Sequence, residues 1–200
     1  MPQGNLAGMA KLHIMYPMDI ELKTERLILK RPTREDCRML MMAIGDPKVA
    51  ATTLNVPHPY SLDDAVAWIE RVNDPEIQKT NLDLSIFLAD TGELIGGVGL
   101  SSINHKHHKA ELGYWLAVDH WNKGFATEAA ARIIRYGFEE LNLERIYAIC
   151  FSTNPASAKV MEKIGMVYEC LARHEFVKDG EFVDFHHYAI LRHDWKKLQG

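Results

Sequence analysis

The sequence predicts a single α/β domain in which helices flank a mixed β-sheet. Segments of strand length, with alternating or continuous apolar residues, are interspersed with segments whose apolar residues recur at helical spacing. In chain order they read as a strand, two helices, a hairpin, a strand, a long helix, a strand, a helix and a second hairpin. With 200 residues, 47% of them hydrophobic, the chain is long enough to bury one substantial core.

The N-terminal part is expected to give one strand and two helices. Residues 1–20 lack an apolar stretch long enough for a signal peptide and are expected to form a flexible arm, so the folded domain would cover residues 21–198. The first strand is expected over residues 24–31, before Pro32. The buried stripe of the first helix, which ends at Gly45, comprises Cys37, Leu40, Met41 and Ile44. That of the second, which begins after Ser61, comprises Leu62, Ala65, Val66, Ile69 and Val72.

The next segment predicts a hairpin followed by a polar loop. Strands are expected over residues 84–89 and 94–100, on either side of the turn formed by residues 90–93. Glycines within the second strand indicate close approach by another group, and they are Gly96, Gly97 and Gly99. The polar loop at residues 103–108 contains three histidines, but no matching set of ligands accompanies them, so we expect no metal site.

A strand expected over residues 111–118 leads through a glycine-containing corner into a long helix. The apolar stripe of that helix comprises Ala126, Ala130, Ile133, Ile134, Gly137, Phe138 and Leu141. Small residues at the corner let a ligand approach the backbone, and the first turn of a helix presents unpaired N–H groups at its positive end. The corner at residues 121–127 is therefore predicted to bind a phosphate or diphosphate.

The C-terminal part predicts a buried strand, a capped helix and a second hairpin. Residues 145–151 form a nearly continuous apolar run, as expected of a strand covered on both faces. Asn154 and Pro155 are suited to the cap and first residue of a helix over residues 156–164, closed by Gly165. Strands at residues 167–177 and 181–191 flank a turn at residues 178–180.

The corner resembles motif A of the GNAT N-acetyltransferases, written Gln/Arg-x-x-Gly-x-Gly/Ala. Gly124 and Ala126 occupy the two small positions, while Trp121 stands where Gln or Arg is usual. That departure, with Ala-Thr-Glu-Ala at residues 126–129 and Thr-Glu-Arg-Leu at residues 24–27, is similar to the ribosomal-protein N-acetyltransferase (RimJ/RimL-like) branch. The resemblance extends over about residues 21–195.

The resemblance implies the GNAT fold, a mixed and mostly antiparallel sheet with splayed central strands and flanking helices. It also implies acetyl-CoA as the acetyl donor, with its pantetheine arm between the splayed strands. The cofactor-binding residues would be Leu116, Val118, Trp121, Asn122, Lys123, Gly124, Phe125, Ala126, Thr127, Asn154, Ser157 and Lys163. The first two helices and their linking loop would form a wall of the acceptor pocket, in which the acceptor contacts would be His58, Tyr60 and Tyr114. His58 and Tyr60 serve equally well as local packing groups.

The implied reaction is direct attack of an amine on the thioester. Glu111 is the candidate general base, and its alternative role is a salt bridge at the strand end. Much of the superfamily protonates the leaving thiolate with a tyrosine, but the matching position here is Met161. Ser157 is the candidate substitute, and its alternative role is to satisfy backbone groups of the first helical turn.

Charge and cysteine content limit the partners. A net charge of −4 and a pI near 6.2 argue against nucleic-acid and membrane partners. Cys37, Cys150 and Cys170 lie in apolar segments and read as reduced core thiols of a cytoplasmic protein. The acceptor is predicted to be a protein N-terminus, with a small-molecule amine (polyamine, amino acid or antibiotic) as the alternative. A non-catalytic acyl-CoA-binding module is the rival function. Family members often form homodimers, but the sequence does not determine the oligomeric state.

Overall fold

The computed structural model describes residues 20–199 and confirms the predicted α/β class. Eight strands form one sheet in the order β1-β2-β3-β4-β5-β6-β8-β7. Among the described strands only β5 and β6 pair in parallel. The strand bounds are β1 (Glu21–Lys23), β2 (Leu27–Lys30), β3 (Leu82–Leu88), β4 (Leu94–Asn104), β5 (Lys109–Leu116), β6 (Arg145–Phe151), β7 (Val167–Lys178) and β8 (Glu181–Leu191).

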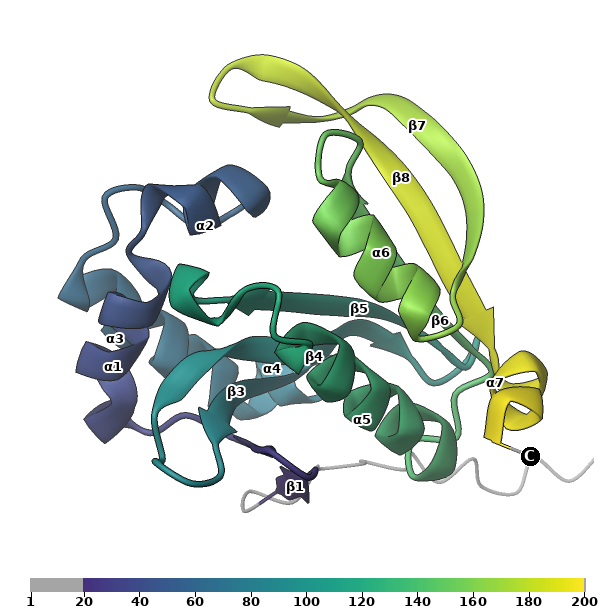
Figure 1. Cartoon of the computed structure of the whole chain (residues 1–200), viewed down its shortest axis with the longest axis horizontal. Helices are drawn as coiled ribbons and strands as arrows, with labels where there is room; N and C mark the ends of the chain where they lie inside the picture. The colour runs from purple at the N-terminus through teal and green to yellow at the C-terminus, as the bar shows by residue number, and fades with distance from the viewer. Residues whose placement is uncertain (1–19, 200) are drawn as a thin grey trace, which may run out of the picture.

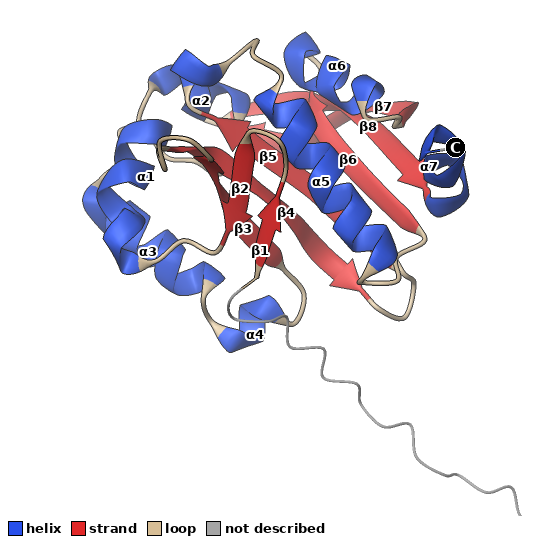
Figure 2. Ribbon diagram, turned by 60° about the horizontal axis from the view of Figure 1, so that its bottom comes forward, coloured by secondary structure: helices blue, strands red, loops and turns tan. Residues whose placement is uncertain are grey.

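Helices cover the sheet unevenly, as Figures 1 and 2 show: α5 lies across the central strands, while α1, α2 and α3 gather at one end. The helix bounds are α1 (Cys37–Ile44), α2 (Pro47–Thr52), α3 (Leu62–Val72), α4 (Pro75–Gln78), α5 (Phe125–Glu139), α6 (Pro155–Lys163) and α7 (Arg192–Gln199). Short 3₁₀ turns are η1 (Arg34–Asp36) and η2 (Val118–His120). No helix among residues 20–199 is long and apolar enough to cross a membrane.

The core has two parts because neighbouring residues of a strand project to opposite faces of the sheet. Ile86 of β3 belongs to the larger cluster, which contains the buried stripe of α5. The next residue, Phe87, belongs to the smaller cluster beneath α1 and α3. The stripe predicted for α5 is confirmed between Ala130 and Phe138, and it fixes this helix, with the corner before it, against the middle of the sheet. At its two ends, Ala126 is half-buried and lines the cleft, and Leu141 is buried but lies beyond the helix.

The expected divergence of the central strands is present. Strands β5 and β6 pair at three positions, where Lys109, Ala110 and Glu111 face Arg145, Ile146 and Tyr147. Beyond this point β5 continues to pair with β4, and β6 with β8, but β5 and β6 no longer pair with each other. An opening between two strands of one sheet results, and the corner and α6 lie beside it.

Several elements differ from the expectations. The chain between residues 21 and 30 forms two short strands rather than one, because Thr24 bonds back to the carbonyl of Leu27 and closes a turn. Helices α2, α4 and α7 were not predicted; α2 and α4 are too short to show a helical period. The strand expected at 94–100 extends to Asn104, and the strand expected at 111–118 runs from Lys109 to Leu116.

Two predicted core positions are wrong. Leu62, at the first position of α3, is 40% exposed, whereas Ala65, one turn further along, is fully buried. Cys170 is exposed on β7, whereas Cys37 and Cys150 are buried as expected. The expected N-terminal arm lies outside the described residues except for Ile20, which is buried in the larger core cluster.

Candidate active site

A cleft of about 460 Å³ lies beside the opening between β5 and β6. Its walls are the end of β5, the corner before α5, and one side of α6. Most of the predicted cofactor-binding residues line it, namely Leu116, Trp121, Asn122, Gly124, Phe125, Ala126, Thr127, Asn154, Ser157 and Lys163. Val118 and Lys123 are not among its lining residues: Val118 lies in η2, and Lys123 is exposed.

The corner presents unoccupied backbone donors to this cleft. Asn122 (φ 60°) and Gly124 (φ 83°) both adopt left-handed backbone conformations, which Asn and Gly tolerate best. Within residues 20–199, no amide from Asn122 to Thr127 donates a hydrogen bond to another protein group. The free N–H groups of the first turn therefore remain available to an anion at the positive end of α5.

The opposite wall is the start of α6, which is fixed by its cap. The side chain of Asn154 accepts a hydrogen bond from the Ser157 amide at 3.1 Å, and Pro155 occupies the first helical position. Lys159 and Lys163 also line the cleft, so two positively charged residues lie on this wall. Both walls therefore favour a negatively charged ligand.

Tyr114 of β5 joins the two walls. Its hydroxyl donates to the Ser157 carbonyl at 3.0 Å and lies 2.9 Å from Ser157 Oγ. Burial raises the pKa of Tyr114, so the phenol stays neutral. Burial also raises the pKa of the Cys150 thiol, a neighbour of Ser157 outside the cleft lining, to about 11, so this thiol is protonated near neutral pH.

Two further positions bear on the predicted chemistry. Met161, where much of the superfamily has a tyrosine, is 1% exposed and packs in the larger core cluster, leaving Tyr114 and Ser157 as the hydroxyl groups that join the cleft walls. The indole Nε1 of Trp121 donates to the Leu116 carbonyl at 2.8 Å. A pantetheine amide approaching Leu116 would have to share that carbonyl.

A second cavity of about 260 Å³ meets the cleft at Tyr114 and Trp115, which line both. The first two long helices, the loop between them and the middle strands contribute its other lining residues, namely Leu40, Ile44, Asn55, Val56, Tyr60, Trp68, Asp83, Leu84, Gly97, Val98, Gly99, Ser101 and Gly113. Tyr60 therefore lies in this second cavity, but His58 is exposed and lines neither space. Burial and the nearby Asp64 raise the pKa of Tyr60 to about 12.

The floor of the second cavity depends on glycine. A Cβ on Gly97 would lie 2.5 Å from Trp115 Nε1, and one on Gly99 would lie 2.9 Å from Asp83 Oδ1. The close approach expected at these glycines is thus explained by the Trp115 side chain at Gly97, and at Gly99 by the Leu82 carbonyl, 2.8 Å from the Cβ position, together with the Asp83 carboxylate. Burial raises the pKa of Asp83, while the positive charges of Arg71 and Arg31 oppose that shift.

Glu111 lies at the last paired position of β5, where the strands diverge. It lines neither space, and Gly113, two residues further along the strand, lines the second cavity. Burial raises the pKa of Glu111, although a hydrogen bond from Tyr147 and the nearby His187 lower it. His187 in turn lies 2.7 Å from Glu175. The carboxylate is half-buried among groups that can accept or donate protons.

Sequence reasoning missed several contributors to this region. Thr52, Trp115 and His120 also line the cleft, and no local pattern singled them out. It also missed that Thr24 and Arg26 bond to Glu128 of α5 from more than 100 residues away. Both residue groups lie in short motifs that the sequence analysis had identified, at residues 24–27 and 126–129. Nothing in the sequence indicated that the two motifs are in contact.

Comparison with known proteins identifies the same family that the motif at the corner resembles. The Acetyltransferase (GNAT) domain model matches residues 26–167. YoaA of Bacillus subtilis, an uncharacterized N-acetyltransferase, is 31% identical over 178 residues, covering 89% of this chain and 98% of that protein. YdaF of the same organism, provisionally named a ribosomal N-acetyltransferase, is 38% identical over 106 residues, covering 52% of this chain and 57% of that protein.

The solved structures include a spermidine N-acetyltransferase from Vibrio cholerae in complex with CoA and spermine. It has a TM-score of 0.73 and 26% sequence identity, and the alignment covers 86% of this chain and 99% of that one. Within residues 20–199, no group of three or more His, Cys, Asp or Glu side chains could hold a metal ion. The chain therefore belongs to the GNAT acetyltransferase family, is similar to its ribosomal-protein branch, and is an acetyl-CoA-dependent N-acetyltransferase.

Proposed function

We propose that the chain acetylates a primary amine, with acetyl-CoA in the cleft and the acceptor in the second cavity. The observation that carries this proposal is the junction of the two spaces at Tyr114 and Trp115, beside the opening between β5 and β6. The diphosphate binds the free amides of the corner, and Lys159 and Lys163 supply further positive charge. The pantetheine arm then leads along the opening toward the junction.

The amine must lose a proton for the transfer. An α-amino group has a pKa of about 8, so about a tenth of it is neutral at pH 7, whereas a lysine amine has a pKa of about 10.4. Glu111 is the base in this proposal, directly or through a bound water, because its carboxylate lies where the two strands part. Its raised pKa brings it nearer to the pKa of an amine and improves the match between base and acid.

The thiolate of coenzyme A leaves as the tetrahedral intermediate collapses, and it needs a proton. Ser157 is the proton donor in this proposal, and Tyr114 holds its hydroxyl at 2.9 Å. The high pKa of Tyr114 keeps that partner protonated. A backbone N–H of β5 beyond Glu111, where pairing with β6 has ended, stabilises the oxyanion.

The second cavity favours a protein N-terminus over a polyamine. Aromatic groups surround it, and among its lining residues Asp83 has the only carboxylate, with Arg71 and Arg31 close enough to oppose its charge. Such a cavity lacks the surplus of negative charge that several ammonium groups would need. An α-amine with one small or apolar side chain fits it better. The Vibrio cholerae relative was solved with spermine, so a polyamine is the second candidate.

An assay with a panel of amines tests the proposal. Purified protein is incubated with acetyl-CoA and equal concentrations of short peptides, amino-acid amides, spermidine or no amine. Release of coenzyme A and the acetylated product, identified by mass spectrometry, are followed together. We expect kcat/KM to be highest for peptides with small N-terminal residues. Binding of acetyl-CoA without turnover of any amine would instead indicate an acyl-CoA-binding module.

Gly124→Val tests the corner. A β-branched residue is strongly disfavoured at φ 83°, so the corner should change conformation and bind acetyl-CoA at least tenfold more weakly by calorimetry. Gly92→Val is the matched control, because Gly92 has φ 72° in the β3–β4 turn, away from both spaces. An equal loss of acetyl-CoA affinity in the two variants, or no loss in Gly124→Val, would contradict the assignment of the diphosphate to the corner.

Glu111→Gln tests the base. A base works only when deprotonated, so the wild-type rate should fall as the pH drops through the raised pKa of Glu111. The amide cannot accept the proton, so kcat should fall about 100-fold and lose that acid limb, with the affinity for acetyl-CoA unchanged. Glu169→Gln, which removes the partner of Arg145, is the control. A wild-type pH profile in Glu111→Gln would remove this residue from the mechanism.

Gly113→Leu tests the acceptor cavity. A Cβ on Gly113 would meet no atom within 4 Å, so a larger side chain can enter the cavity without displacing the strand. We expect kcat/KM for the acceptor to fall at least tenfold, with acetyl-CoA affinity within twofold of the wild type. Gly113→Ala should give an intermediate loss. Unchanged acceptor kinetics in the leucine variant would place the acceptor elsewhere.

A further inference from the structure

Two short motifs far apart in the sequence form one bonded unit. Thr24 Oγ1 donates to Glu128 Oε1 at 2.6 Å, and the Arg26 amide donates to the same oxygen at 3.0 Å. Arg26 Nε donates to Glu128 Oε2 at 2.7 Å. The start of the domain is therefore tied to the first turn of α5, the helix whose N-terminus forms the corner.

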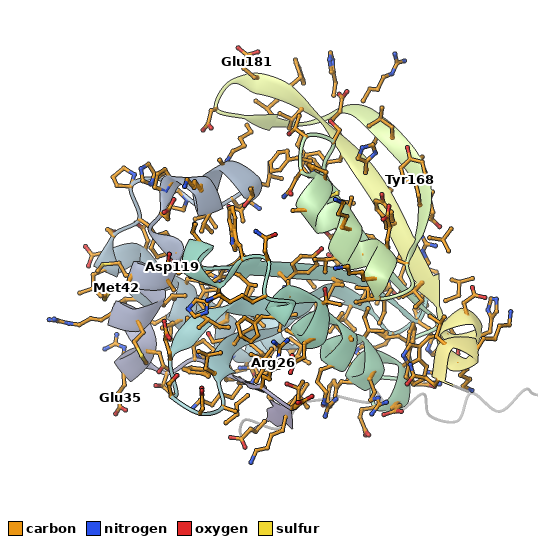
Figure 3. All side chains as sticks on the ribbon, in the orientation of Figure 1. Arg26, Glu35, Met42, Asp119, Tyr168 and Glu181 are labelled. Carbon is orange, nitrogen blue, oxygen red and sulfur yellow. The ribbon has the colours of Figure 1, made fainter. Side chains whose placement is uncertain are left out.

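Arg26 also contacts the corner directly. Its Nη1 donates to the Lys123 carbonyl at 3.1 Å, and its guanidinium lies 4.5 Å from the centre of the Phe125 ring. Its Nη2 lies 3.5 Å from where a Cβ on Gly124 would be. Figure 3 shows Arg26 beside the N-terminal end of α5. Arg26 is not among the residues that line the cleft, so it supports the corner from behind.

The bond to the Lys123 carbonyl has a geometric consequence. That carbonyl and the N–H of Gly124 belong to one planar trans peptide, in which the two groups point in opposite directions. A guanidinium that holds the oxygen on the outer side therefore turns the Gly124 N–H toward the inner side, where Gly124 lines the cleft. Gly124, which follows this peptide, has a left-handed conformation and no side chain, and would otherwise allow the peptide to rotate.

Arg26 is also needed because of the negative charge of Glu128. Burial would raise the pKa of Glu128, but Thr24 and Arg26 together hold it below its ordinary value, so the side chain is an anion at neutral pH. An anion in the first turn of α5 repels a diphosphate bound at that turn. Arg26 offsets this repulsion, because its guanidinium binds the carboxylate with two nitrogens.

We propose that Arg26 is a positioning residue for the diphosphate of acetyl-CoA. It fixes the peptide between Lys123 and Gly124, and it neutralises the charge of Glu128. The inference rests on the proposed place of the coenzyme in the cleft. It assigns a role to the Thr-Glu-Arg-Leu motif that the chemistry of the transfer did not use. Its effect belongs to coenzyme binding and not to the transfer step.

Arg26→Gln, compared with two acetyl donors, tests this role. With acetyl-CoA, we expect KM to rise about tenfold or more, with kcat within twofold of the wild type. With S-acetylpantetheine, which has the thioester but no diphosphate, we expect kcat/KM within twofold of the wild type. Thr24→Val, a milder change in the same unit, should raise KM for acetyl-CoA about threefold.

Arg132→Gln is the matched control, because Arg132 donates from α5 to the Lys23 carbonyl and lies outside the cleft. It should leave KM for both donors unchanged. The inference is overturned if Arg26→Gln keeps the wild-type KM for acetyl-CoA. It is also overturned if kcat/KM falls equally with acetyl-CoA and with S-acetylpantetheine, because a general loss of structure affects both donors alike. If wild-type protein binds coenzyme A by calorimetry but transfers to no amine, the proposed function fails while the role of Arg26 can still be measured by the coenzyme affinity.

Discussion

Strands β5 and β6 pair at three positions and then part, and the site depends on how the chain tolerates that parting. Backbone N–H and C=O groups without partners in a buried place cost free energy, so each must find a substitute for the missing strand. A side chain supplies part of it, because the Trp121 indole donates to the Leu116 carbonyl at the end of β5. The Tyr114 hydroxyl, which donates to the Ser157 carbonyl, ties β5 to α6 across the opening. In the proposed function, the amide groups of pantetheine supply the rest. The opening would then accept an extended polar chain because it is an incomplete sheet.

The two sides of the opening are built differently. The cleft, which is the proposed coenzyme site, is built on main chain held by regular structure: the start of α5, buried against the middle of the sheet, and the start of α6, capped by Asn154. The acceptor side consists of side chains from α1, α3, the loop between them and the middle strands. Backbone donors recognise a diphosphate regardless of the residues that carry them. If the second cavity holds the acceptor, as proposed, substitution of its side chains can change the preferred amine while the backbone donors of the cleft remain the same.

This difference explains what the sequence could predict. The helical stripe from Ala126 to Phe138, the glycine at the corner and the Asn154 cap are local patterns, and the structure has each of them. The second cavity was only partly foreseen: Tyr60 lines it, but His58 does not, and Trp115 and Asp83 were not anticipated. Its members are brought together by strand register and helix packing, which leave no spacing in the sequence. The bonds of Arg26 to Glu128 span 102 residues and were not visible for the same reason.

The protonation states of the buried groups around the junction determine which of them could attack the thioester. The Cys150 thiol and the phenols of Tyr60 and Tyr114 all have raised pKa values because they are buried, so none of them is an anion that could attack the thioester. Covalent transfer through the enzyme thus lacks a nucleophile among these groups. Burial raises the pKa of Glu111 as well, but at a carboxylate the consequence differs, because a higher pKa makes its anion a stronger base. In the proposed mechanism, the burial that keeps these hydroxyl and thiol groups protonated also strengthens the base that removes a proton from the amine, and the acceptor then attacks the thioester directly.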